Sequence, residues 1–525
     1  MASRSVLARV ARKALVSTAA PTGEGYSIRA VGALTSKPYA FKTRSWELKS
    51  TESIDIFDGV GSNIRIDTRG SEIMRVLPRL NEHVNEEWIS DKSRFSYDGL
   101  KRQRLSTPMV RNVDGNLLPV QWDRARAVLK NALITLQLEN PGGFECHGVI
   151  GPYVDVNAAL EFRNQFLRWF PTGQMHVQEK ARNIPTDFRH SYMHNLTLPQ
   201  LEEADFVLLV GADPRKEAPL LNARLRKGSL YHGVTVATVG SPVSLTYPSK
   251  HLGNTLKTLQ AIADGSHPIA ATLTEAERPV IMVSNRALQR EDGNAVYKLV
   301  EDVVRKSKAV QEGWDGLCVL HQGANTVGNL DIGFEDKYAG LRALDAGSWS
   351  ATKVLFLMGA DDIDNIDVPE DCFVVYQGHH GDRGASIANV VLPGAAYTEK
   401  DSIYVNTEGR VQASKLAFFP PGLARDDAHV LRDLLGADED LEHVTEQLKS
   451  ASLDILAPHL LKTNYVQEGD RVLGTDTILP PGRTPFLPTP LQSPVDNFYM
   501  TDPITRSSKT MAKCTRVRNT HNFSQ

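Results

Sequence analysis

The chain has 525 residues, of which 41% are hydrophobic and 23% are charged, a composition typical of a soluble protein of roughly two to four domains. The 59 Lys and Arg residues nearly balance the 62 Asp and Glu residues, with a net charge of −3, which excludes a globally basic surface for nucleic acid. No uninterrupted apolar run approaches the ~18 residues that a transmembrane helix needs, so any membrane association is expected to go through a partner.

The N-terminus reads as a targeting segment. MASRSVLARVARKALVSTAAPTG carries Arg4, Arg9, Arg12 and Lys13, and no acidic residue precedes Glu24. Its apolar residues recur at helical spacing beside the basic ones, as in mitochondrial transit peptides. The sequence therefore predicts a transit peptide over residues 1–25 and a mitochondrial location; the alternative is a basic tail without structure.

The next segment predicts a small β-rich domain over residues 44–110. From Ser53 onward, SIDIFDGVGSNIRIDTRG alternates apolar and polar residues around glycines, a pattern typical of short antiparallel strands joined by tight turns. SEIMRVLPRL continues that alternation.

Residues 111–468 predict an α/β core. VQWDRARAVLKNALITLQ and a second stretch over 154–170 have helical spacing, and continuous Val, Leu and Ile runs bounded by glycine follow. Such runs indicate parallel strands buried on both faces. DFVLLVGADP (205–214) and KVLFLMGADD (353–362) share one strand-and-turn pattern, which predicts two Rossmann-like halves with a crevice between them. Residues 469–525 are rich in proline and predict an extended arm, the alternative being a disordered tail.

Longer segments resemble known families. DRGASIANVVLPGAAYTEKDSIYVNTEGRVQ (382–412) resembles the molybdopterin oxidoreductases. The segments 34–41, 46–64, 85–105 and 497–514 resemble the family of the large iron–sulfur subunits of mitochondrial NADH:ubiquinone oxidoreductase, respiratory complex I. The resemblance runs from about residue 30 to residue 514 and implies a molybdopterin-oxidoreductase-like fold of two halves with a β-rich N-terminal domain. It also implies a matrix-side location among other complex I subunits, including the NADH-oxidising module.

The chain departs from that family at its cysteines. The family's ferredoxin-like region is absent, and SIRAVGALTSKPYAF has Arg29 and Ala30 where a Cys-Pro pair is usual. The β-rich domain resembles a 4Fe-4S domain of molybdenum enzymes without its cysteines. We therefore expect a split subunit, no cofactor in this chain, and iron–sulfur clusters in a separate ferredoxin-like partner polypeptide.

In the molybdenum enzymes that the chain resembles, a protein ligand to the metal lies in the segment that corresponds to residues 175–195. That segment has no cysteine; Asp187 and Ser191 are conceivable ligands, and three histidines, His176, His190 and His194, invite the same interpretation. Their spacing matches no known ligand set, so a polar loop packed on its neighbours is the favoured alternative.

Other candidate sites are weak. The turn at Gly211 lacks a GxGxxG fingerprint, and Asp213 and Pro214 disfavour a phosphate there. A better anion cradle is HQGANTVGN, with Gly323, Asn325, Thr326 and Gly328. A turn containing His379, His380, Asp382 and Arg383 is expected to hold an Asp–Arg pair, and GLKRQRL (99–105) to contact an acidic protein surface.

The resemblance implies a core subunit of complex I, and the missing cysteines predict a structural role without catalysis by this chain alone. No catalytic, cofactor-binding or metal-binding residue is assigned, and whether a nucleotide enters the crevice near Gly211 and Gly359 stays open. The alternative is an active molybdenum or tungsten oxidoreductase acting on a small substrate such as formate.

Overall fold

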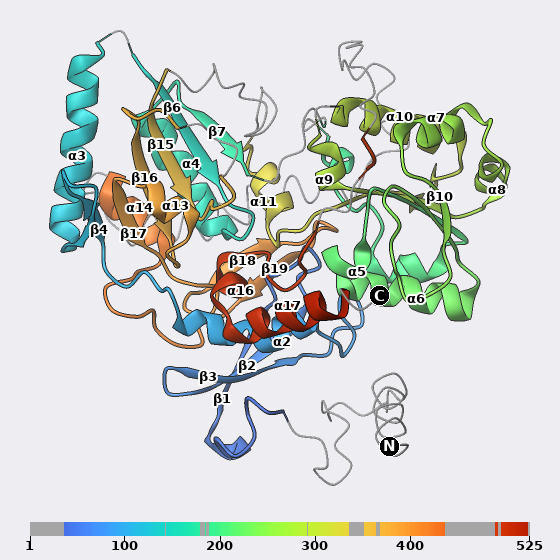
Figure 1. The fold of residues 1–525 in the computed structure, drawn as a ribbon, viewed down its shortest axis with the longest axis horizontal. Helices are drawn as coiled ribbons and strands as arrows, with labels where there is room; N and C mark the ends of the chain where they lie inside the picture. Colours follow the sequence, from blue (N-terminus) through green and yellow to red (C-terminus); the bar gives the residue numbers. More distant parts are fainter. Residues whose placement is uncertain are drawn as a thin grey trace.

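The structure, a computed structural model, describes residues 36–141, 143–178, 184, 188–290, 292–334, 351–363, 368–435, 489–491 and 495–522. The predicted transit peptide lies outside them. Figure 1 shows two α/β lobes side by side, with a small sheet below and two C-terminal helices crossing between. This mixed α/β architecture with a β-rich N-terminal part confirms the predicted fold class. In the described part of the chain, no helix is long and apolar enough to cross a membrane.

The N-terminal part is a three-stranded antiparallel sheet. It consists of β1 (Lys49–Ile54), β2 (Asn63–Arg69) and β3 (Glu72–Pro78), preceded by the short 3-10 helix η2 (Ser45–Glu47). The turns fall where glycines were expected to place them. Two short helices, α2 (Asp91–Phe95) and η3 (Ser96–Lys101), follow.

The first lobe contains a seven-stranded sheet in the order β5-β4-β17-β16-β15-β6-β7. The strands from β17 to β7 are parallel, and β4 and β5 form an antiparallel edge. The strand bounds are β4 (Met109–Arg111), β5 (Leu117–Pro119), β6 (Glu145–Ile150), β7 (Gln174–Val177), β15 (Thr352–Met358), β16 (Phe373–Gly378) and β17 (Val390–Pro393). The helices of this lobe are α3 (Trp122–Glu139), α4 (Val156–Trp169), α11 (Thr326–Asp331), α13 (Arg383–Ile387) and α14 (Asp427–Leu435).

The second lobe contains a five-stranded parallel sheet in the order β10-β9-β8-β11-β14. Every residue of β8 and β11 is buried, as the continuous apolar runs predict. The strands are β8 (Phe206–Val210), β9 (Thr235–Val239), β10 (Lys250–Gly253), β11 (Pro279–Ser284) and β14 (Leu317–Leu320). The helices are η4 (Arg189–Ser191), η5 (Leu198–Glu203), α5 (Pro214–Glu217), α6 (Pro219–Lys227), the π-helix η6 (Gly228–His232), α7 (Leu256–Asp264), α8 (Ile269–Glu275), α9 (Asn285–Leu288) and α10 (Gly293–Lys306).

Two small ladders complete the strands, β12 (Val310–Gln311) with β13 (Trp314–Asp315), and β18 (Ser402–Val405) with β19 (Val411–Ser414). The repeated GAD turns lie in different sheets, one in each lobe. Gly211 after β8 has φ of 58° and Gly359 after β15 has φ of 56°, so both glycines adopt the same left-handed turn. The two lobes are thus built around the same strand-and-turn unit.

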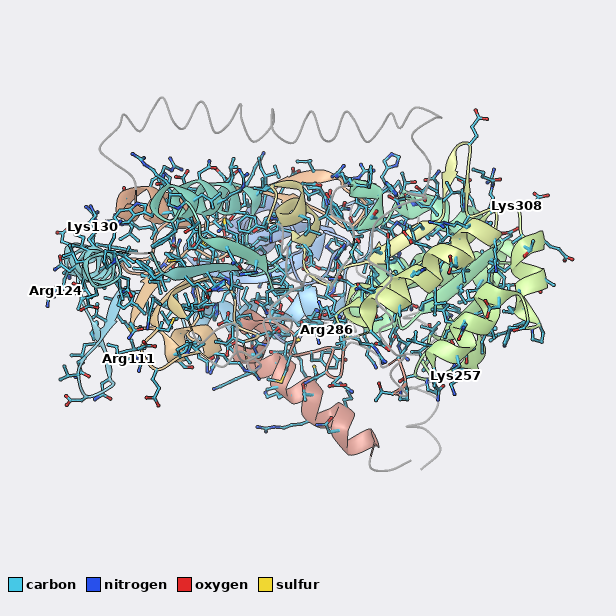
Figure 2. The ribbon with its side chains drawn as sticks, turned by 90° about the horizontal axis from the view of Figure 1, so that it is seen from above. Arg111, Arg124, Lys130, Lys257, Arg286 and Lys308 are labelled. Carbon is cyan, nitrogen blue, oxygen red and sulfur yellow. The ribbon has the colours of Figure 1, made fainter. Side chains whose placement is uncertain are left out.

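Basic side chains are spread over the molecule. Figure 2 shows Arg111, Arg124 and Lys130 at the end of the first lobe and Lys257 and Lys308 at the opposite end. Arg286, on α9, lies between these groups. This distribution agrees with the balanced charge of the sequence.

The C-terminal segment differs from the extended arm that its prolines predict. Residues 436–488 lie outside the described part, but α16 (Pro503–Ser507) and α17 (Lys509–Asn522) are helices. Pro503 occupies the first turn of α16, where its missing N–H costs nothing, and the Asp502 side chain accepts the N–H of Thr505 at 2.9 Å. The prediction is wrong for residues 503–522 because it extended the proline-rich stretch before them to the end of the chain, although only Pro503, at the start of α16, lies in these helices.

Candidate functional site

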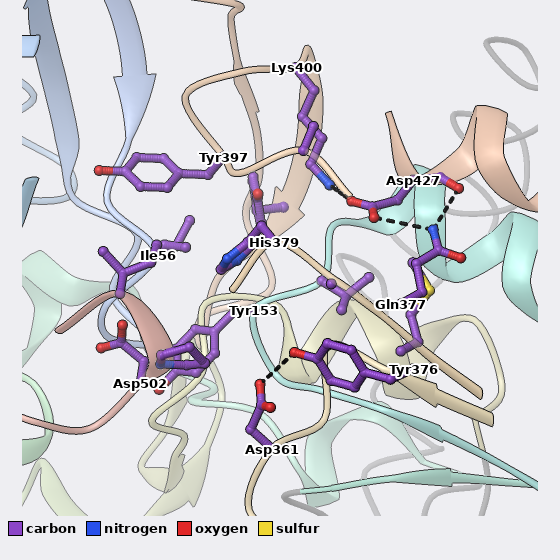
Figure 3. Close-up of a pocket in the computed structure, with 18 residues that line it drawn as sticks. Ile56, Tyr153, Asp361, Tyr376, Gln377, His379, Tyr397, Lys400, Asp427 and Asp502 are labelled. Carbon is purple, nitrogen blue, oxygen red and sulfur yellow. Dashed lines mark hydrogen bonds and ion pairs between the residues drawn. The ribbon is translucent and has the colours of Figure 1, made fainter. Parts of the chain in front are cut away.

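The described residues enclose a small cavity at the carboxyl edge of the seven-stranded sheet. The chain leaves the sheet at this edge after β6, β15 and β16. From the boundary between β6 and β15 the later strands are added in opposite directions, and open α/β sheets bind ligands at such a switch point. The cavity has a volume of about 40 Å³. Its walls come from the N-terminal domain, the first lobe and the C-terminal segment. Polar groups in its wall are Tyr153, Asp361, Tyr376, His379, Tyr397, Lys400, Asp427 and Asp502 (Figure 3).

A buried lysine between two carboxylates forms one wall. The Nζ atom of Lys400 lies 2.6 Å from Asp155 and 2.5 Å from Asp427, and all three side chains are nearly inaccessible to solvent. Burial alone lowers the pKa of Lys400, but the two carboxylates outweigh it and raise that pKa well above its usual range. Asp155 also caps α4 through the N–H of Ala158 at 3.0 Å. The ammonium is therefore fixed in place as part of the framework.

His379 lines a second wall and is paired with His380 in a defined tautomeric arrangement. His380 Nε2 lies 3.1 Å from the carbonyl of Gly99, which can only accept, so this nitrogen carries the proton. His380 Nδ1 is then the acceptor for the Nδ1–H of His379, at 2.5 Å, and Nε2 of His379 keeps its lone pair. Burial lowers the pKa of His380 to about 3 and that of His379 well below its ordinary value. Both rings are neutral at physiological pH.

Asp361 closes the cavity on the side of β15. Its carboxyl group accepts the hydroxyl of Tyr376 at 3.0 Å and the N–H of Gly384 at 3.1 Å (Figure 3). Burial, and then the charge of Asp382, raise the pKa of Asp361 to about 7. Asp382 itself pairs with Arg506 of α16 at 2.7 Å, so the C-terminal helix neutralises this edge of the site.

The size and chemistry of the cavity limit its use. Cofactor pockets usually measure about 300–1,000 Å³, whereas a cavity of about 40 Å³ admits only a few water molecules. Its lysine is held by two carboxylates and its histidines are paired with each other. Within the described ranges, no three His, Cys, Asp or Glu side chains are arranged to hold a metal ion.

The candidate metal ligands of residues 175–195 do not converge where the structure describes them. His176 Nε2 lies 2.9 Å from His147 Nδ1 on the neighbouring strand, and His194 Nδ1 donates to the carbonyl of Leu196 at 2.7 Å. The backbone carbonyl of Ser191 accepts the hydroxyl of Tyr297 at 3.1 Å. His190 is half-buried near the ring of Phe188, and Asp187 lies outside the described residues.

The candidate anion-binding turns are packed against the protein itself. Asn325 donates to the carbonyl of Val154 at 2.7 Å and accepts the N–H of Val405 at 3.0 Å. Around it, Gly323, Thr326 and Gly328 are buried at the start of α11. The Asp213 carboxylate pairs with Lys216 at 3.0 Å, and Pro214 begins α5. In this structure these residues bind other groups of the chain and stabilise its fold.

For two further predicted segments, the structure shows ion-pair partners that lie far away in the chain. Asp382, expected to pair with an arginine of its own turn, binds Arg506 more than a hundred residues away. In the basic segment 99–105, Arg104 makes a two-pronged ion pair with buried Glu399 and also donates to the carbonyl of His379 at 3.0 Å. The segment therefore contributes to the interior as well as to the surface. The Lys400 cluster has no local sequence signal, since its members are 245 and 27 residues away from the lysine in the chain (400 − 155 and 427 − 400).

The N-terminal domain contains a second buried polar cluster. Lys92 Nζ donates to the carbonyl of Phe57 at 2.8 Å and to Thr501 Oγ1 at 3.1 Å, which links this domain to the C-terminal segment. Asp55 accepts the hydroxyl of Ser93 and the N–H of Phe57. Burial, and then the charge of Asp55, raise the pKa of Asp58 to about 7.

Comparison with known families accounts for nearly the whole described chain. Residues 104–437 match the family model of molybdopterin oxidoreductases. Residues 48–98 match the 4Fe-4S domain of the NADH-ubiquinone oxidoreductase NDSU1/NuoG-like proteins. Residues 480–514 match a third model, which describes the C-terminal segment of a NADH-ubiquinone oxidoreductase subunit.

Individual relatives agree with these matches. The chain is 43% identical over 501 residues to the NADH-ubiquinone oxidoreductase 75 kDa subunit of Reclinomonas americana, covering 93% of this chain and 71% of that protein. It is 43% identical to the mitochondrial 78 kDa subunit of Candida albicans, covering 92% and 66%. It is 41% identical to the mitochondrial NADH dehydrogenase iron-sulfur protein 1 of Solanum tuberosum, covering 94% and 65%. The chain thus spans about two thirds of the length of these relatives.

The match of residues 48–98 corrects one prediction. The expectation of no cofactor in this chain, with the clusters confined to a partner polypeptide, is contradicted, because a 4Fe-4S domain in this chain points to an iron–sulfur cluster here. The prediction went wrong by judging the domain from its side chains at a few expected ligand positions, whereas the match extends over the whole strand-and-turn framework.

The matched segment lacks the side chains that usually hold such a cluster. Iron–sulfur clusters are held mainly by cysteine thiolates, and residues 48–98 contain no cysteine. The buried groups gathered there are the carboxylates of Asp55 and Asp58, the hydroxyl of Ser93 and the ammonium of Lys92. This segment by itself does not fit a thiolate-held cluster, and no redox step is assigned to it.

Three family models in the expected order, and relatives above 40% identity over more than nine tenths of this chain, agree on one assignment. The chain belongs to the family of the large, 75–78 kDa subunits of NADH-ubiquinone oxidoreductase.

Proposed function

We propose that this chain is a core subunit of mitochondrial respiratory complex I that supports electron transfer from NADH to ubiquinone. The observation that carries the proposal is the similarity over 92–94% of the chain to relatives named as NADH-ubiquinone oxidoreductase subunits. Its place is the matrix side of the inner membrane, where it contacts other complex I subunits. Those contacts include the NADH-oxidising module and the ferredoxin-like, cluster-bearing part of the complex.

The proposed role is structural and involves no chemistry at the cavity. The cavity at the edge of the first lobe has room for a few waters, and its charged groups are internally paired. Two lobes that share one hydrophobic core make a single body that keeps neighbouring redox centres at fixed spacing. The alternative of a molybdenum- or tungsten-dependent oxidoreductase is disfavoured, because the relatives' names point to complex I and the cavity is far below cofactor size.

Depletion of the chain from mitochondria, followed by a direct assay, tests the proposal. NADH–ubiquinone oxidoreductase activity is expected to fall in proportion to the loss of the chain, while other respiratory activities persist. Metal analysis of the chain purified with its partners is expected to find no stoichiometric molybdenum or tungsten. Unchanged NADH–ubiquinone activity after depletion, or one molybdenum atom per chain, would reject the proposal.

A further inference from the structure

The carboxyl edge of the second lobe's sheet has the topology of a ligand-binding edge. The strand order of the five-stranded sheet reverses between β8 and β11, so this edge is where an open parallel sheet would bind a ligand. Gly211 follows β8 with φ of 58°, and Gly240 follows β9 with φ of 135°. Both glycines let the backbone turn away and leave room at the edge.

A segment from the C-terminal part of the same chain fills that room. Leu491 is fully buried and belongs to the main hydrophobic core. A side chain placed on Gly211 would meet Ala287 at 2.7 Å and the Cβ of Leu491 at 3.7 Å, and one placed on Gly240 would lie 3.0 Å from the carbonyl oxygen of Leu491. A side chain at position 240 would thus crowd the backbone of the leucine, whereas one at position 211 would collide with Ala287 and only touch Leu491.

The backbone of Leu491 is bound on both sides. The N–H of Ser241 donates to the carbonyl of Leu491 at 2.7 Å, and the N–H of Leu491 donates to the carbonyl of Asn254 at 2.9 Å. These bonds connect the segment to the ends of β9 and β10. Main-chain bonds combined with one buried side chain are the usual means of binding an extended peptide.

An arginine clamp holds the residues just before the leucine. Arg290 donates to the carbonyl of Pro490 at 2.7 Å and to the hydroxyl of Thr489 at 3.1 Å. Its guanidinium is positioned by the buried carboxylate of Asp292, at 2.8 and 3.1 Å. Arginine suits this task because its rigid fork can bind a carboxylate and peptide carbonyls together.

We propose that this edge of the sheet is a peptide-binding seat whose occupant is the segment Thr489–Leu491 of the same chain. The seat ties the second lobe to the C-terminal helices. Those helices bind the first lobe through Arg506 and Asp382 at 2.7 Å, and the segment before them binds the N-terminal domain through Thr501 and Lys92 at 3.1 Å. The C-terminal segment is thus a strap across all three parts, and this edge of the second lobe's sheet is its anchor.

Hydrogen exchange measured by mass spectrometry on the full chain tests the seat. Leu491→Asp places a charge in an apolar site and is expected to raise the exchange rate of the Ser241 amide at least tenfold. Leu491→Ala should raise it less and covers the case in which the aspartate variant fails to fold. Leu138→Asp is the matched control, since Leu138 is 76% exposed on α3, and it should leave Ser241 unchanged.

A synthetic peptide distinguishes a binding seat from general loss of packing. The peptide LPTPLQSPV, residues 487–495, added to the Leu491→Asp protein should restore protection of Ser241, and LPTPDQSPV should not. Unchanged exchange in both Leu491 variants, or failure of the native peptide to restore protection, would overturn the proposal. So would ATP or GTP that raises Ser241 exchange in the wild-type chain, because this edge of the sheet would then be a nucleotide site.

Discussion

At the scale of single residues, the buried charges of the first lobe are the least replaceable feature. Lys400 neutralises two buried carboxylates, Asp155 and Asp427, at 2.6 and 2.5 Å. Lys400→Met keeps the length of the side chain but leaves both carboxylates unpaired, and we expect a loss of about 3–5 kcal/mol in the free energy of unfolding. Urea denaturation measures it. Lys353→Met is the control: its partner Asp371 is 63% exposed, so that change should cost less than about 1 kcal/mol. Equal losses in the two variants would contradict the role of Lys400.

A second residue-scale prediction concerns pH. Burial raises the pKa of Glu217 from 4.5 to about 7 in the folded chain. A carboxyl group with a raised folded pKa contributes its full stability below the unfolded pKa and loses it as the pH rises toward 7. Glu217→Gln copies the neutral form and should match the wild type near pH 4.5, then exceed it by up to about 3 kcal/mol at pH 8.

Urea midpoints of both proteins at the two pH values give the comparison. Other buried carboxyls titrate in both proteins and cancel from the difference. Glu203→Gln, at a side chain that is 54% exposed, should show no pH-dependent gap. A gap between wild type and Glu217→Gln that stays constant with pH would show that Glu217 is already ionised in the folded chain.

At the scale of elements, the repeated strand-and-turn unit depends on its glycines. Gly359→Ala combines a left-handed backbone, φ of 56°, with a methyl group 2.9 Å from Val154 Cγ2. We expect a loss of about 2–3 kcal/mol from strain and crowding together. Gly115→Ala has strain alone, since nothing lies within 4 Å of its added methyl group, and should cost about 1 kcal/mol. Thermal unfolding of the two variants tests the difference, and a smaller loss at Gly359 would refute it.

The elements also show what the sequence could and could not predict. Strands such as β8 and β11 were predictable because continuous apolar runs bounded by glycine are typical of strands that are buried on both faces. Helix α3 was predictable from Trp122, Ala125, Leu129 and Leu133, which repeat at helical spacing on its buried face. The C-terminal helices α16 and α17 were not, because they directly follow a proline-rich stretch and only the short signal of Asp502 and Pro503 marks where the first of them begins.

The candidate site was mostly beyond sequence reasoning for a different reason. The partners of Lys400, Asp382 and Arg104 lie far away in the chain, and no local pattern records which distant side chain will meet them. The histidines and glycines that the sequence singles out are real turn and core residues. Their spacing alone could not distinguish packing from ligand binding.

At the scale of the whole molecule, the two lobes share one hydrophobic core, and the C-terminal segment adds further connections between the parts. This segment reaches the second lobe at Leu491, the N-terminal domain at Thr501 and the first lobe at Arg506. Such a body suits a subunit that keeps its neighbours at fixed distances.

Native electrophoresis of mitochondrial membranes tests the central claim most directly. The gel is probed with an antibody to this chain and stained in place for NADH dehydrogenase activity. We expect the chain to migrate in the same high-mass band as the activity, with none at or below 57.9 kDa, the mass of the full sequence before any leader is removed. A chain found only at that lower mass, apart from the NADH dehydrogenase band, would contradict the proposed role in complex I.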